Sequence, residues 1–432
     1  MKNLSKFQLI LLIVFGLFII VGILVFALTK AGTDDSQTEV TIWGTMPASL
    51  FDEVLKRSNL DKNLEIKFTY TAKQKESFDI EFLEALAEGR APDLFFVSED
   101  TILKYQPKIF QIPFKSFSER AFKNSFVEGA EIFLDSQGIL AMPILIDPLV
   151  MYWNRDILTS EGLVQPPEFW DEFYDLSPKL TVKDSGLNIR RSAVALGEFI
   201  NISNAFEILS ALIMQAGNPV TEKSGGQVAV VLGEAMGLPA LPAERALSFY
   251  TDFSNPLKPF YSWNRANPWS ENYFLSGDLA VYFGFASELN VLRDKNPNLN
   301  FDLAPLPQVR DSQRKTTYGK MVALAINKNS PNIGPAFTAA TLLSRRESVL
   351  VWSEVTNLPP IRRDLLSLRP ERAYMEVFYD GALSAKAWVI PDRIKVGEIW
   401  KEMIESVTGG RSRTREAVGK ATGELKTLFE KR

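Results

Sequence analysis

The sequence GILAMPILIDPLVMYWNRDIL, from Gly138 to Leu158, decides the fold. A short apolar run leads into Met142-Pro143, Asp147-Pro148 interrupts the middle, and a β-favouring run from Leu149 to Trp153 follows. Proline lacks a backbone donor and is poorly tolerated inside a central strand. The pattern therefore predicts an extended segment that leaves one core and enters another, with Asp147 at the junction. Equally, Asp147 could be a loop carboxylate that turns the chain beside Pro148.

The composition limits the classes of protein to consider. A chain of 432 residues is too long for one ordinary core, so two lobes are expected. The net charge of −4 supplies no overall basic field, so nucleic acid is not an expected partner. The chain has no cysteine and no histidine, which excludes disulfides, Cys/His zinc sites and thiol or serine–histidine nucleophiles. We therefore expect no metal site and no cofactor.

An uncharged apolar run extends from Leu9 to Leu28, after Lys2 and Lys6. At about 1.5 Å per residue this run matches the roughly 30 Å hydrocarbon core of a bilayer. We expect a cytoplasmic N-terminus at 1–8, a transmembrane anchor at 9–28 and a linker at 29–38. A cleaved signal peptide is the alternative, but its apolar region is usually shorter and ends at a small-x-small site. Either interpretation places the bulk of the chain outside the cytoplasm, in an extracellular or periplasmic position.

The first part after the linker alternates strand and helix patterns. Strands are predicted at Glu39–Gly44, Leu64–Tyr70 and Leu94–Val97, with helices at Ala48–Arg57 and Ser77–Glu88 between them. This alternation is typical of a parallel α/β unit, in which the ligand crevice lies at the carboxyl ends of the strands. The tips after the first and third strands, 43–47 and 98–101, are therefore candidate site loops.

The later part predicts further helices and two more crossings between lobes. Helices are expected at 169–176, 205–216, 243–254 and 336–344, strands at 279–285, broken by Gly284, and at 321–326, and crossings at 301–307 and about 351–360. The segment from Thr221 to Pro242, rich in glycine and small residues, fits either a loop or an insertion. The remainder, 361–432, is mostly helical.

The order of these segments resembles the carbohydrate-binding group of extracellular solute-binding proteins that serve ABC importers, the group that includes maltose-binding protein. The resemblance covers the chain from Glu39 onward and depends on four runs: LAEGRAPDL at 86–94, the crossover at 143–155, SGDLAVYFGF at 276–285, and Tyr318-Gly319 before a strand. It implies an α/β fold of the two-lobed periplasmic-binding-protein type (type II) with hinge crossovers. The first lobe would comprise 39–143 and 307–350, and the second 144–306 and 351–432.

The resemblance also implies the ligand-binding residues. Trp43 and Thr45 match the loop after the first strand, Asp100 an acidic sugar contact and Asp147 a crossover carboxylate, while Val97 stands where the maltose-type pattern has an aromatic residue. Sugars bind to flat aromatic faces and to hydroxyl partners in a concave site. The remaining candidates are the aromatic residues and the glycine Trp263, Trp269, Phe285, Tyr318, Gly319 and Trp388.

The expected function is that of a membrane-anchored binding protein, not an enzyme, that captures a small solute, most simply a mono- or oligosaccharide. Its partners would be the ligand, the membrane subunits of an ABC importer and, through residues 9–28, the membrane. A glycoside hydrolase is one alternative, because it needs two carboxylates about 5 to 9.5 Å apart and Asp100 and Asp147 are available. A ligand sensor for another membrane protein is the other alternative.

Overall fold

The computed structural model describes residues 37–224, 227–310, 312, 314–368, 370 and 372–431. The expected anchor at 9–28, the N-terminal segment at 1–8 and residues 29–36 of the linker lie outside these residues. Among the helices that the structure describes, none is long and apolar enough to cross a bilayer.

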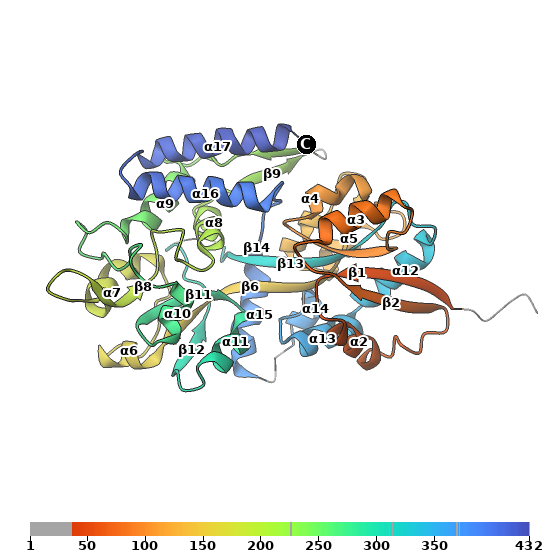
Figure 1. The fold of residues 1–432 in the computed structure, drawn as a ribbon, viewed down its shortest axis with the longest axis horizontal. Coiled ribbons are helices and arrows are strands. Elements are labelled where there is room, and N and C mark those ends of the chain that lie inside the picture. Colours follow the sequence, from red (N-terminus) through yellow and green to blue (C-terminus); the bar gives the residue numbers. More distant parts are fainter. Residues whose placement is uncertain are drawn as a thin grey trace, which may run out of the picture.

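Strand β6 (Met142–Asn154) runs through both lobes (Figure 1). Its first half, Met142 to Pro148, pairs with β13 (Thr317–Ile326), which belongs to the first-lobe part of the sheet. Its second half, Leu149 to Asn154, pairs with β11 (Leu279–Phe285) and β12 (Phe301–Ala304) in the second lobe. The middle of the quoted sequence, Met142 to Asn154, is thus a continuous crossing strand, and all of its residues except Asp147 are buried.

The sheet has ten strands in the order β2-β1-β3-β13-β6-β11-β8-β7, with β12 paired to β6 and β14 to β13. In the first lobe the strands are β1 (Thr38–Gly44), β2 (Ile66–Ala72) and β3 (Leu94–Ser98), all parallel. The first-lobe helices are α2 (Ala48–Arg57), α3 (Phe78–Ala87), α4 (Ile102–Tyr105), α5 (Glu119–Ser125), α12 (Ile333–Ser344), α13 (Arg346–Thr356) and α14 (Arg363–Leu366). Shorter pieces are η1 (Gln106–Lys108), β4 (Ile112–Pro113), η2 (Glu128–Phe133) and β5 (Gly138–Ile139).

The second lobe surrounds β8 (Ile189–Val194) and β11. Its other elements are α6 (Arg155–Ser160), η3 (Trp170–Glu172), α7 (Phe173–Leu180), β7 (Val182–Lys183), α8 (Ala205–Gln215), β9 (Thr221–Ser224), β10 (Gln227–Val230), α9 (Pro242–Asp252), α10 (Ser270–Leu275), α11 (Glu288–Lys295), α16 (Arg393–Thr408) and α17 (Thr414–Glu430). Strand β11 is continuous through Gly284, contrary to the expected break. Glycine is required there because an added Cβ would lie 2.6 Å from Cε1 of Tyr282.

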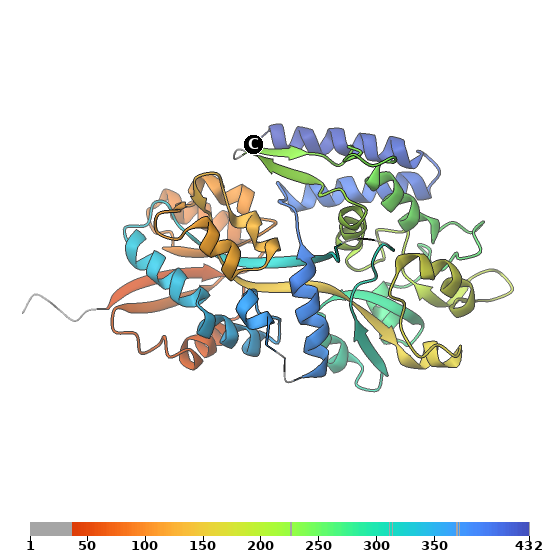
Figure 2. The same ribbon diagram turned by 180° about the vertical axis from the view of Figure 1, so that it is seen from behind.

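Two expected crossings are wrong in position. Strand β12, at the expected crossing 301–307, pairs entirely with the second-lobe half of β6, and the chain returns through β13 instead. The expected third crossing at 351–360 lies in and after α13, which packs in the first lobe through Trp352. The chain crosses later, around α15 (Ala373–Ser384) and β14 (Ala385–Lys386) (Figure 2): the start of α15 packs in the second-lobe core through Met375 and Phe378, and its end packs in the first-lobe core through Ala382. Apolar periodicity alone does not distinguish a buried crossing strand from a strand within one lobe.

Each lobe has its own hydrophobic core. One cluster contains Val40, Phe95 and Leu324, and the other contains Leu209, Phe283 and Trp400. The division of the chain into lobes at 143 and 306 and at 350 stays a proposal. The packing of Trp352 and Ile361 with the first cluster favours moving 351–366 into the first lobe.

Candidate functional site between the lobes

The crossing strands bring parts of both lobes to one place beside the hinge. Lys320 on β13 lies opposite Asp147 on β6, and Gly319 lies opposite Pro148. The end of β3 joins them, because the backbone N–H of Met321 donates to Oε2 of Glu99 at 2.9 Å. The loop after β11 completes the group, since the N–H of Ser287 donates to Oδ1 of Asp147 at 3.0 Å.

An ion-pair network connects the two lobes at this place. Oδ2 of Asp100, after β3, lies 3.9 Å from Nε of Arg393, and Nη2 of Arg393 lies 2.5 Å from Oε1 of Glu207 on α8. Asp392 caps α16 by accepting from the N–H groups of the next turn, which fixes Arg393 at the first helical position. The guanidinium of Arg393 also lies over the ring of Phe206, 3.8 Å from its centroid.

Two polar atoms in this network have no hydrogen-bond partner among the described residues: Oδ1 of Asp100 and Nη1 of Arg393. Both atoms are buried. A buried acceptor and a buried donor without partners cost free energy, so such atoms call for an explanation. They belong to two side chains that already form an ion pair, one from each lobe.

The carboxylates of the site are shifted by burial. Burial raises the pKa of Glu99 to about 8, and the nearby Asp100 carboxylate adds to this shift. Burial also raises the pKa of Asp147 to about 6, against the hydrogen bond from Ser287 and the positive charge of Lys320. The pKa of Asp100 is raised by burial as well, with Arg393 acting in the opposite direction. Perturbed carboxylates that gather between lobes are typical of a functional site.

Aromatic rings line the same place, and cations cover their faces. The ammonium of Lys320 lies 3.6 Å from the ring centroid of Phe285. Phe285 in turn meets Tyr318 edge to face, with centroids 6.5 Å apart. The rings of Phe285 and Tyr318 are buried, as is that of Phe206, which meets Trp388 at a centroid distance of 5.8 Å.

Five of the ten predicted site residues therefore come together: Asp100, Asp147, Phe285, Tyr318 and Gly319. Trp388 adjoins them through Phe206, but it is buried and stacked on Trp400 at 5.3 Å. Gly319 is required by packing, since an added Cβ would lie 2.6 Å from Cβ of Ala385.

The other four lie apart from this group. Trp43 is half-buried at the end of β1, with Lys73 over its ring at 3.9 Å, and Thr45 is exposed just beyond it. Trp263 is fully buried in the second-lobe core, and its indole N–H donates to Asn201 at 3.1 Å. Trp269 is 45% exposed on the surface.

Sequence reasoning missed Glu99, Arg393, Glu207, Lys320 and Phe206. Glu99 had a signal, because it precedes Asp100 at the end of a predicted strand. Arg393 and Glu207 had none, since they are 186 positions apart and only the tertiary structure joins them.

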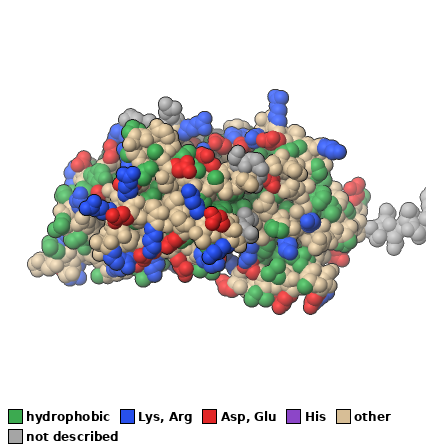
Figure 3. Space-filling model, turned by 90° about the horizontal axis from the view of Figure 1, so that it is seen from above, with side chains coloured by type: hydrophobic (Ala, Val, Ile, Leu, Met, Phe, Trp, Pro, Cys, Tyr) green, Lys and Arg blue, Asp and Glu red, His purple; other side chains and the backbone are tan. Residues whose placement is uncertain are grey.

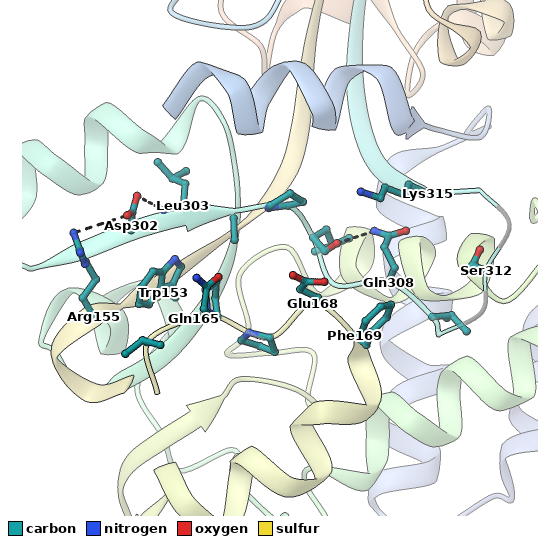
Figure 4. A pocket seen from close by; sticks show the side chains of 17 residues that line it. Trp153, Arg155, Gln165, Glu168, Phe169, Asp302, Leu303, Gln308, Ser312 and Lys315 are labelled. Atoms are coloured by element: carbon teal, nitrogen blue, oxygen red, sulfur yellow. Dashed lines mark hydrogen bonds and ion pairs between the residues drawn. The ribbon is translucent and has the colours of Figure 1, made fainter. Parts of the chain in front are cut away.

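A separate hollow of about 610 Å³ lies in the second lobe (Figure 4). Trp153, Glu168, Phe169 and Gln308 line it, and Arg155 and Asp302 form an ion pair of 3.9 Å at one side. Asp100, Asp147 and Arg393 do not line this hollow. A ligand there would touch one lobe, whereas a ligand at the ion-pair network would touch both.

Comparison with known proteins agrees with the two-lobed architecture. The sequence pattern of the family described as bacterial extracellular solute-binding protein matches residues 48–348. A binding protein of Brucella abortus (strain 2308) is 20% identical over 387 residues, which is 87% of this chain and 86% of the relative.

Solved structures share the fold. A cyclo/maltodextrin-binding protein complexed with maltotetraose superposes with a TM-score of 0.74 at 16% identity, over 92% of this chain and 99% of that chain. The sugar-binding protein of Xanthomonas citri gives 0.73 at 18% identity, over 91% and 98%. The cyclic alpha-maltosyl-1,6-maltose binding protein of Arthrobacter globiformis gives 0.74 at 14%, over 92% and 100%.

Proposed function

Because the chain belongs to the family of bacterial extracellular solute-binding proteins, we propose that it captures a carbohydrate between its lobes and delivers it to an ABC importer. The family consists of binding proteins, so the chain is a binding protein and not an enzyme. This membership removes the glycoside hydrolase alternative.

The observation that carries the proposal is the pair of unpartnered atoms, Oδ1 of Asp100 and Nη1 of Arg393. A sugar hydroxyl both donates and accepts a hydrogen bond, so one hydroxyl can pair with a carboxylate oxygen and a guanidinium N–H together. Hydrogen bonds to charged groups are about twice as strong as neutral ones. Since Asp100 and Arg393 come from different lobes, a ligand bound to both would hold the lobes together.

Other groups of the site suit the same ligand class. Asp147 is half-buried with one oxygen bonded to Ser287, and we propose that its other oxygen accepts a sugar hydroxyl. Phe285, Tyr318 and Trp388 are buried beside the network, and Lys320 covers the ring of Phe285, so a sugar would stack on Phe285 only after Lys320 moves. Three structural neighbours are described as binding maltodextrin-type or other sugars, which supports the carbohydrate assignment.

The remaining predicted contacts, Trp43, Thr45, Gly319, Trp263 and Trp269, stay proposals. Trp43 and Thr45 lie at the carboxyl end of a parallel strand, where ligands of α/β sheets bind. Trp263 is enclosed by the second-lobe core, so we expect it to support the site from behind instead of stacking on a ligand.

We further propose that residues 9–28 anchor the protein in the membrane, with the two lobes outside the cytoplasm. The family is extracellular, which agrees with this placement of the lobes. On the face seen in Figure 3, acidic and basic side chains are interspersed, as expected for a soluble receptor domain and not for a nucleic-acid-binding surface.

Isothermal titration calorimetry of the full chain in detergent, against a panel of mono- and oligosaccharides, tests this function. At least one sugar should bind with a 1:1 stoichiometry. Amino acids and polyamines serve as comparison ligands. Binding of one of these classes in place of every sugar would overturn the carbohydrate assignment while leaving solute binding in place.

A further inference from the structure

The segment 221–242, which the sequence did not place, begins with a β-hairpin of β9 and β10. The base of this hairpin belongs to the second lobe. Asn218 fixes it, since Oδ1 of Asn218 accepts from the N–H of Val220 at 2.8 Å and Nδ2 donates to the carbonyl of Val231 at 2.7 Å. Val230 lies in the second-lobe core. Figures 1 and 2 show the hairpin beside α17, running toward the first lobe.

The other end of the hairpin contacts the first lobe. Nζ of Lys223 lies 3.6 Å from Oδ1 of Asp135 and donates a hydrogen bond to the carbonyl of Leu134. Val228, on the opposite strand, packs against the first-lobe core. The hairpin is thus rooted in one lobe, and its contacts with the other include the ion pair and hydrogen bond of Lys223 and the apolar packing of Val228.

The first lobe holds its half of this contact in place. Oδ2 of Asp135 accepts from the side-chain amides of Gln106 at 3.0 Å and Gln111 at 2.9 Å. The side chain of Asp135 is only 8% exposed, so its negative charge is largely removed from water. The second oxygen, Oδ1, lies 3.6 Å from Nζ of Lys223 and accepts no hydrogen bond from the described residues. Removing the cation would leave a buried carboxylate without a countercharge, which is costly.

Space beside the contact allows the lobes to move. A cavity of about 380 Å³ lies next to the hairpin, lined by Thr221 and Lys223 from the second lobe and by Leu134 and Asp135 from the first. Because this space is not filled by side chains, the lobes can change their separation here without breaking a packed core.

We propose that the β9–β10 hairpin is an interlobe latch, and that Lys223 is the positioning residue that sets the separation of the lobes before ligand binds. Hinged two-lobed proteins populate more than one separation, and a contact present in only one of them shifts the population toward it. Only the effect of the latch on ligand capture rests on the proposed function. The separation of the lobes in the free protein can be measured without any ligand.

The test uses the full chain with two introduced cysteines, R120C on α5 and K426C on α17. Both native side chains are exposed, and the sequence contains no other cysteine, so two spin labels attach only there. Pulsed electron resonance then reports the distance between the lobes. In ligand-free protein, Lys223→Ala and Asp135→Asn should each broaden the distance distribution and shift it to longer values. The double variant should show no more than the larger single effect, because both changes break one contact. Lys223→Arg should restore the original distribution.

Lys295→Ala is the matched control. It removes an ion pair of 2.6 Å between Lys295 and Glu271, both in the second lobe, and should leave the distribution unchanged. Unchanged distances in both latch variants, or effects that add in the double variant, would overturn the latch. If a sugar binds but the distances do not respond to Lys223→Ala, the proposed function survives and the latch fails. If the distances respond but no sugar binds, the latch survives and the carbohydrate assignment fails.

Discussion

The ion pairs Asp135–Lys223 and Asp100–Arg393 both join the lobes, and they differ in what they leave without a hydrogen bond. Between Asp135 and Lys223, two glutamine amides donate to one carboxylate oxygen, and the other oxygen lies 3.6 Å from the ammonium without a hydrogen bond among the described residues. Between Asp100 and Arg393, one carboxylate oxygen and one guanidinium nitrogen face no partner among the described residues. In the first contact the one oxygen without a hydrogen bond already faces a cation, which suits a structural latch. The second is incomplete, and a ligand hydroxyl would complete it.

The largest expected effect comes from removing the cation of the incomplete pair. Arg393→Gln should weaken sugar binding about 100-fold, since it also removes the hydrogen-bonded partner of the buried Glu207, and truncating one partner of such a charge pair costs about 2 kcal/mol or more. Calorimetry with the best sugar of the panel measures this loss. Arg310→Gln is the control, because Arg310 forms an exposed pair with Asp171 at 2.8 Å elsewhere in the second lobe. Equal affinities of Arg393→Gln and the unmodified protein would show that the ligand does not complete the Asp100–Arg393 pair.

A smaller loss is expected when the acceptor alone is changed. Asp100→Asn keeps the shape of the side chain but removes its charge, so binding should weaken about 10-fold. The same substitution in the latch contact, Asp135→Asn, touches no proposed ligand contact and should change affinity less than Asp100→Asn does. Titrating both variants with one sugar sharpens the comparison directly. A larger loss for Asp135→Asn would show that the roles of the two pairs are reversed.

A dependence of stability on pH is expected from Glu99, which lies next to the incomplete pair. Its pKa in the folded protein is raised to about 8, so folding favours the protonated form. The associated stability is present below the unfolded pKa and is lost as the pH rises through 8. Between pH 5 and pH 8, the free energy of unfolding measured with urea should therefore fall more for the unmodified chain than for Glu99→Gln. An equal fall of the free energy of unfolding in both proteins would mean that Glu99 does not bind its proton more tightly in the folded state.

The smallest effect is expected at Trp269. This residue is 45% exposed and lies apart from both ion pairs, so Trp269→Ala should change the free energy of unfolding by no more than about 0.5 kcal/mol. Trp263→Ala, in the same segment, should cost about 3 kcal/mol or more, because that ring is fully buried. Chemical denaturation distinguishes the two. A large loss of sugar affinity in Trp269→Ala, without loss of stability, would support a direct contact of that side chain with the ligand.

The sequence predicted individual helices and strands better than the crossings between the lobes. Helix α2 and strand β11 have the predicted bounds because clear apolar periodicity and turn residues mark them. The crossing through Pro143 to Asp147 is confirmed by β6, since its prolines and aspartate are readable locally. The crossing placed at 301–307 is wrong, because a strand that pairs on one side of a hinge has the same pattern as one that crosses it.

The same limit applies to the site. Asp100 and Asp147 could be proposed from strand ends and from the resemblance. Arg393 could not, because its position depends on a helix cap by Asp392 and on contacts with Glu207, far away in sequence. Trp263 and Trp388 were expected as ligand platforms. Aromatic residues suit a core and a sugar site equally well, and only the fold shows that both rings are buried.

Hydrogen–deuterium exchange, with and without the best sugar of the panel, tests the central claim most directly. If the ligand completes the pair between Asp100 and Arg393, amides at 98–101 in the first lobe and at 390–396 in the second should both gain protection. Protection confined to one lobe, or to the hollow lined by Glu168 and Gln308, would contradict capture between the lobes.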